Sequence, residues 1–86
     1  MKTQIDLSIS VGRSLREVYS KEFGELLPLR RDDFISINDI SYVVQDCGFV
    51  EDEGVSFWLV TTKISGFDGS EGRDIIAALK RDGWKP

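Results

Sequence analysis

The hydrophobic and polar positions along the chain follow two different periods. Residues 4–11 alternate strictly, with polar side chains at the even positions and Ile5, Leu7, Ile9 and Val11 at the odd ones. A period of two is typical of a half-buried strand with one face in solvent. The first segment is therefore predicted to be a strand at the start of a sheet.

The next segment carries the start and stop signals of a helix. Ser14 and Glu17 have the spacing of a capping box, in which both side chains bond free backbone N–H groups of the first turn. Apolar residues follow at helical spacing, and Gly24 suits a helix C-terminus. The pattern predicts a short helix over residues 15–23.

Three strands are predicted in the middle of the chain. They cover residues 34–37, Ile40 to Val50 and Val55 to Ile64. Asn38 and Asp39 form a plausible two-residue type I′ turn between the first two strands, because both residue types tolerate a positive φ.

The last two of these strands are predicted to form a hairpin with a three-residue loop, in which Gly54 takes the left-handed position. In that register Phe49 lies opposite Phe57 and Cys47 lies opposite Leu59, which makes apolar cross-strand pairs.

The C-terminal segment has helical periodicity. Gly72, Ile75, Ile76, Leu79 and Gly83 share one face, so an amphipathic helix ending at a glycine is expected. The predicted fold is an α+β domain over residues 1–86. It has a small antiparallel sheet of three to four strands, which can curl, and two short helices in the order β-α-β-β-β-α.

Composition adds limits on the partners and the location. The chain has 86 residues, of which 41% are hydrophobic and 30% charged, as in an ordinary globular domain. The net charge of −4 disfavours nucleic acid and anionic membranes as partners. No apolar run approaches the roughly 20 residues of a membrane helix. Cys47 is the single cysteine, which favours a reducing, cytoplasmic location.

The residue types disfavour catalysis. The sequence contains no histidine, so Ser–His and Cys–His pairs cannot form, and one cysteine with carboxylates is no recognised zinc pattern. The adjacent carboxylates Glu51, Asp52 and Glu53 lack the spacing of a calcium loop and suit a solvated hairpin tip. We expect no enzyme activity, no cofactor and no metal site.

The hairpin over residues 40–64 is apolar on both faces, which is unusual for a small antiparallel sheet. One face is a candidate partner-binding surface, formed by Trp58, Tyr42, Val44 and Val60. The acidic turn of Glu51, Asp52 and Glu53 lies at its edge. This face is internal core, an interface with a protein partner or a second copy, or a surface on which a ligand ring stacks.

The sequence therefore favours a non-enzymatic binding or regulatory module that acts through protein–protein contacts. Its small size and acidic balance suit an accessory protein or inhibitor of a phage or mobile element. A structural subunit of a larger assembly is an alternative.

Nucleic-acid binding is a further alternative, through a local basic patch of Arg30, Arg31, Lys63 and Arg73. From Ser14 to Asp82 the expected order α-β-β-β-α is similar to that of double-stranded-RNA-binding domains. That family has a lysine cluster at the start of its last helix, where this chain has Ser70-Glu71-Gly72-Arg73-Asp74.

Overall fold

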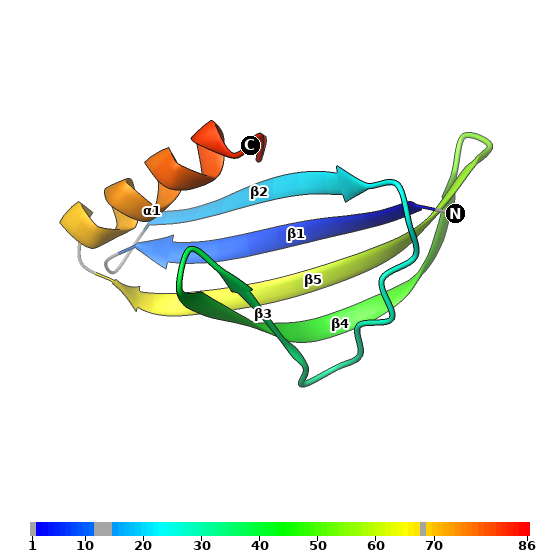
Figure 1. The fold of residues 1–86 in the computed structure, drawn as a ribbon, viewed down its shortest axis with the longest axis horizontal. Coiled ribbons are helices and arrows are strands. Elements are labelled where there is room, and N and C mark those ends of the chain that lie inside the picture. Colours follow the sequence, from blue (N-terminus) through cyan, green and yellow to red (C-terminus); the bar gives the residue numbers. More distant parts are fainter. Residues whose placement is uncertain (1, 12–14, 68) are drawn as a thin grey trace.

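The computed structural model describes residues 2–11, 15–67 and 69–86 and contains a curled, five-stranded mixed sheet with one helix (Figure 1). Its elements are β1 (Lys2–Val11), β2 (Leu15–Phe23), β3 (Phe34–Ile37), β4 (Ile40–Asp52), β5 (Val55–Phe67) and α1 (Gly69–Arg81). The strand order is β2-β1-β5-β4-β3. The β1–β5 pair is parallel and the others are antiparallel. The sheet is a half-barrel with β2 and β3 as its edge strands.

The predicted fold class is wrong in three respects: the sheet has five strands, it is mixed, and it is accompanied by one helix. The segment predicted as a helix over 15–23 is strand β2, and Ser14 of its expected capping box lies outside the described residues. Glu17, Tyr19, Lys21 and Phe23 all face one side of β2. The segment pairs with β1 at nine positions and buries Tyr19, and these contacts stabilise a strand more than the weak helical spacing stabilises a helix. Because this segment is a strand, the order α-β-β-β-α that resembles double-stranded-RNA-binding domains is not formed.

The first hairpin turn is confirmed and the second is corrected. Asn38 and Asp39 have φ angles of 52° and 64°, as a type I′ turn requires. The β4–β5 hairpin also has a two-residue turn, with φ of 50° at Glu53 and 81° at Gly54. The predicted three-residue loop is therefore wrong.

The register of the second hairpin changes along its length. Near the turn, Phe49 pairs with Trp58 and Cys47 with Val60, one position away from the predicted pairs. A bulge between Val44 and Asp46 then shifts the strands by one residue. Beyond the bulge the register is the predicted one.

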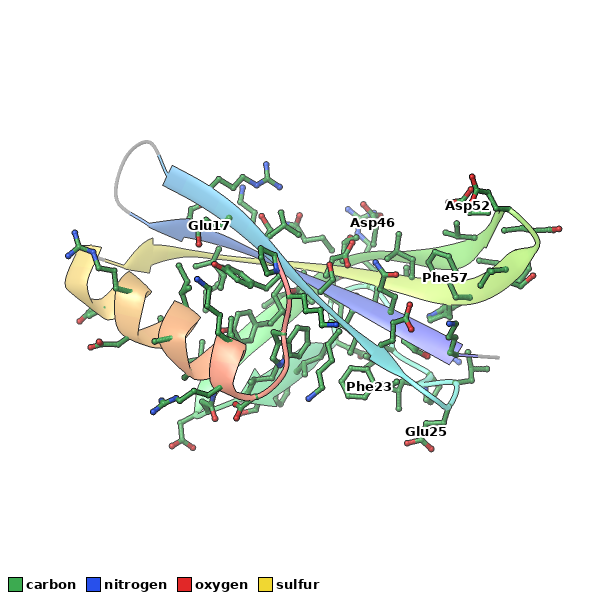
Figure 2. The ribbon with its side chains drawn as sticks, turned by 90° about the horizontal axis from the view of Figure 1, so that it is seen from above. Glu17, Phe23, Glu25, Asp46, Asp52 and Phe57 are labelled. Atoms are coloured by element: carbon green, nitrogen blue, oxygen red, sulfur yellow. The ribbon has the colours of Figure 1, made fainter. Side chains whose placement is uncertain are left out.

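The concave face of the half-barrel carries the core. Odd-numbered residues of β1 point toward α1, and the other strands add side chains to the same layer. The buried apolar residues are Ile5, Leu7, Ile9, Tyr19, Tyr42, Val44, Val60, Leu79 and Trp84. Figure 2 shows Phe23 on the side of the helix, whereas Asp46 and Phe57 lie on the opposite, convex side.

Helix α1 ends at a glycine, as the sequence predicts. Gly83 has a φ of 90°. Its N–H donates to the carbonyl of Lys80 at 3.2 Å, and the N–H of Trp84 donates to the carbonyl of Leu79 at 3.0 Å. These two bonds define a Schellman motif, which turns the chain back so that Trp84 packs into the core beside Leu79.

Candidate functional site

A groove of about 780 Å³ opens on the concave face, between the edge strands β2 and β3 and the segment after α1. Its lining is mostly apolar, with Lys21 and Asp82 among the polar residues. The apolar residues are Ile5, Phe23, Leu27, Pro28, Leu29, Phe34, Ile35, Ile37 and Trp84. Volumes of roughly 300–1,000 Å³ with such a lining are usual for ligand sites.

The groove is open because the helix covers only one end of the concave face (Figure 1). Contacts between α1 and the sheet are made with β1 and β5. The edge strand β3 has four residues, and Ile35 and Ile37 on it remain only half-buried. The single helix thus leaves apolar side chains of the half-barrel uncovered.

One wall of the groove is a loop that Thr3 fixes to the sheet. The Thr3 side chain is fully buried, donates to the carbonyl of Glu25 at 2.9 Å and accepts from the N–H of Leu27 at 2.9 Å. This pair of bonds holds the β2–β3 connection over the concave face, so that Leu27 and Leu29 line the groove.

The opposite wall is aromatic and carries a cation. The rings of Phe23 and Trp84 meet edge to face, with centroids 6.2 Å apart and planes at 64°. The Lys21 ammonium lies 5.7 Å from the Phe23 centroid and 5.8 Å from that of Trp84. The same ammonium donates to the carbonyl of Asp82 at 2.8 Å.

The predicted partner-binding surface is largely interior. Tyr42, Val44 and Val60 are 0% exposed, so in this conformation they are core and cannot contact a partner. The apolar face that they define is the concave face, which α1 and the β2–β3 connection cover in part. Of the three alternatives for this face, the burial of these residues favours internal core.

Trp58 lies on the same concave face and is half-buried. It borders a small cleft with residues 26–30 of the β2–β3 connection, so this loop covers the ring. Its indole Nε1 is buried and has no hydrogen-bond partner. A partner role for Trp58 stays a prediction.

The acidic residues Glu51, Asp52 and Glu53 are exposed at the tip of the β4–β5 hairpin. The tip projects from the end of the half-barrel at which β1 begins (Figure 1). Within residues 2–11, 15–67 and 69–86, no group of three or more carboxylate or cysteine residues is placed to hold a metal ion.

The four cations proposed for nucleic acid are all exposed but belong to different parts of the fold. Arg30 and Arg31 lie in the β2–β3 connection, Lys63 is on the convex face of β5, and Arg73 is on α1, which covers the concave face. Arg31 and Lys63 both lie beside Val43, which pairs with Lys63 and shares a cleft with Arg31. Arg73 lies on the other side of the sheet.

Two tyrosines of the core have perturbed acidity. The pKa of Tyr19 is raised to about 12, mainly by burial. The hydrogen bond of 2.6 Å that its Oη donates to Glu17, and the negative charge of that carboxylate, raise the pKa further. Burial alone raises the pKa of Tyr42, whose hydroxyl is buried without a partner. Both phenols are therefore structural groups that stay protonated at neutral pH.

Comparisons of the chain with family models, curated proteins and solved structures find no match. Over the described part of the chain, no helix is long and apolar enough to cross a membrane.

Sequence reasoning missed the groove because its walls come from segments far apart in the chain. Lys21 and Phe23 were assigned to a helix. The two-residue spacing of Tyr19, Lys21 and Phe23 was the available signal, since in a strand it places all three on one face.

Proposed function

We propose that this chain is a non-enzymatic binding module whose ligand lies in the concave groove. The observation that carries the proposal is an apolar groove of about 780 Å³ in a domain of 86 residues. Filling it would remove apolar surface from water at about 25 cal/mol per Å², the usual driving force of such binding. The absence of histidine from the sequence also supports binding over catalysis.

An uncharged apolar dye, N-phenyl-1-naphthylamine, tests this proposal. We expect its fluorescence to rise on a one-to-one complex with the wild-type chain. Ile37→Asp places a carboxylate in the groove and should abolish the rise, whereas Val55→Asp, at an exposed hairpin position, should leave it unchanged. Equal binding by both folded variants, or no binding by the wild type, would contradict the proposal.

A protein partner, or a second copy of the chain, is the second candidate, and one observation on the convex face favours it. Val18, Val43 and Phe34 are 45%, 47% and 67% exposed. Val43 and Phe34 are neighbours in one register row, and Val18 lies in the same row beyond Ser8 and Lys63. Phe34, on the edge strand, also borders the groove. Exposed apolar side chains in a row are typical of protein contacts.

Sedimentation measurements test the self-association form of this second candidate. The wild type should show a concentration-dependent dimer, and Val43→Glu should be monomeric with an unchanged far-UV spectrum. A wild type that is monomeric at all concentrations would remove self-association.

For the location we propose a reducing, cytoplasmic compartment, supported by the lone, half-buried thiol of Cys47.

A further inference from the structure

The cation at the groove mouth indicates what kind of apolar ligand the groove takes. Lys21 faces the groove from β2, and its ammonium lies close to the rings of Phe23 and Trp84. Its hydrogen-bond acceptor is the backbone carbonyl of Asp82, a neutral group. An ammonium has three N–H donors, so two are left for another acceptor.

Lys21 also lacks a carboxylate counterion within the described part of the chain, where the one ion pair joins Lys2 to Glu22 at 3.3 Å. The nearby carboxylate of Asp82 instead accepts from the Asn38 amide at 3.1 Å. An acidic chain, with a net charge of −4, thus presents an ammonium that has no ion-pair partner among the described residues beside an apolar groove, which the acidic residue Asp82 also lines.

We propose that the groove binds an aliphatic carboxylate, with the hydrocarbon chain against Leu27, Leu29, Ile35 and Ile37 and the carboxylate at Lys21. This inference rests on the proposed function, because it uses the same groove. A hydrocarbon chain carries no polar group into the apolar lining, whereas a peptide would bring backbone N–H and C=O groups that need partners there. A cationic amphiphile would be repelled by Lys21.

Calorimetric titration of the full chain with decanoate, decan-1-ol and decyltrimethylammonium tests the inference. The two ionic compounds are kept below their micelle concentrations and decan-1-ol below its solubility limit. We expect decanoate to bind at least tenfold more tightly than decan-1-ol, and the cation to bind most weakly. Shortening decanoate to octanoate should weaken binding, because each methylene contributes about fourfold in affinity.

Two substitutions of Lys21 test whether its ammonium causes the preference for decanoate over decan-1-ol. Lys21→Met keeps the apolar stem and should weaken decanoate about tenfold more than it weakens decan-1-ol. Lys21→Arg keeps the charge and should retain most of the preference for decanoate. Lys2→Met, which removes a lysine on the other face of the sheet, should behave as wild type.

These measurements distinguish failure of the carboxylate inference from failure of the proposed function. Equal affinities for decanoate and decan-1-ol, unaffected by Lys21→Met, would overturn the carboxylate inference and leave the groove as a binding site. No binding of either compound to the folded wild type would overturn the inference and the proposed function together.

Discussion

The Lys21 ammonium on β2 donates a hydrogen bond of 2.8 Å to the carbonyl of Asp82, in the turn that follows α1. Two backbone bonds reinforce this link, from the Ser20 N–H to the Lys85 carbonyl at 2.7 Å and from the Lys85 N–H to the Ser20 carbonyl at 3.0 Å. The C-terminal segment therefore pairs with the outer edge of β2. It holds Trp84 in place as a wall of the groove.

The position of Trp84 depends on Gly83, which leads to a first prediction. Gly83→Ala should destabilise the fold by about 1 kcal/mol, because its φ of 90° is unfavourable for a residue with a Cβ. The added methyl group would contact nothing within 4 Å, so backbone strain is the whole cost. Thermal unfolding should show a midpoint lower by roughly 4–8 °C.

Gly24→Ala is the matched control, since a Cβ there also meets open space and its φ is not positive. We expect an unchanged or slightly higher midpoint. Equal losses from both substitutions would contradict the Schellman motif at the end of α1.

Thr3→Val should loosen the loop wall of the groove. The substitution keeps the side-chain shape but removes both bonds of the hydroxyl, leaving the Leu27 N–H and the Glu25 carbonyl without this partner. We expect a loss of about 1–3 kcal/mol of stability and faster amide hydrogen exchange at Leu27. Thr62→Val should cost less, because the Thr62 hydroxyl makes a single contact of 3.4 Å with the Asp6 carbonyl.

The raised pKa of Tyr19 predicts a loss of stability in alkali. Its value rises from 10.0 in the unfolded chain to about 12 in the fold, so between these pH values the folded state binds more protons. This contribution to stability is fully present below pH 10 and disappears as the pH rises toward 12. Urea unfolding at several pH values should show this slope, and Tyr19→Phe should flatten it. The same slope in the variant would assign it to other groups.

Tyr42→Phe should have the opposite effect on stability from Tyr19→Phe at neutral pH. The Tyr42 hydroxyl is buried without a partner, so its removal relieves a desolvation cost. We expect the variant to be as stable as the wild type or more stable. Tyr19→Phe loses a 2.6 Å bond to Glu17 and should be less stable. A marked loss for Tyr42→Phe would reveal a partner for its hydroxyl.

The two-residue turn at the hairpin tip gives a fifth prediction. Glu53 has a φ of 50°, a conformation that asparagine adopts more readily in type I′ turns. Glu53→Asn should therefore stabilise the fold by about 0.5–1 kcal/mol, while Glu51→Asn, within the strand, should not. Equal effects would argue against this turn type.

The sequence predicted those elements whose local pattern agrees with their packing. The strict alternation of Ile5, Leu7 and Ile9 marked β1, and the spacing of Ile75, Ile76 and Leu79 marked α1 and its end at Gly83. The Asn38-Asp39 turn was also recognisable, because both residues suit a positive φ.

The rest depended on contacts between distant segments. Residues 15–23 carry a helix-like start, and only pairing with β1 makes them a strand. The bulge at Gln45 allows apolar pairing on both sides of it, so a single register inferred from the pattern could not hold throughout. The groove could not be predicted without β2, because Lys21 and Phe23 enter it from that strand.

Backbone ¹H–¹⁵N correlation spectra of the full chain, recorded during a titration with decanoate, test the central claim most directly. If the concave groove is the binding site, the shift changes will concentrate on Lys21, Phe23, Leu27, Ile35, Ile37 and the Trp84 indole, and Val18 and Val43 on the convex face will not move. Saturating shifts confined to the convex face, or no shifts in the folded protein, would contradict it.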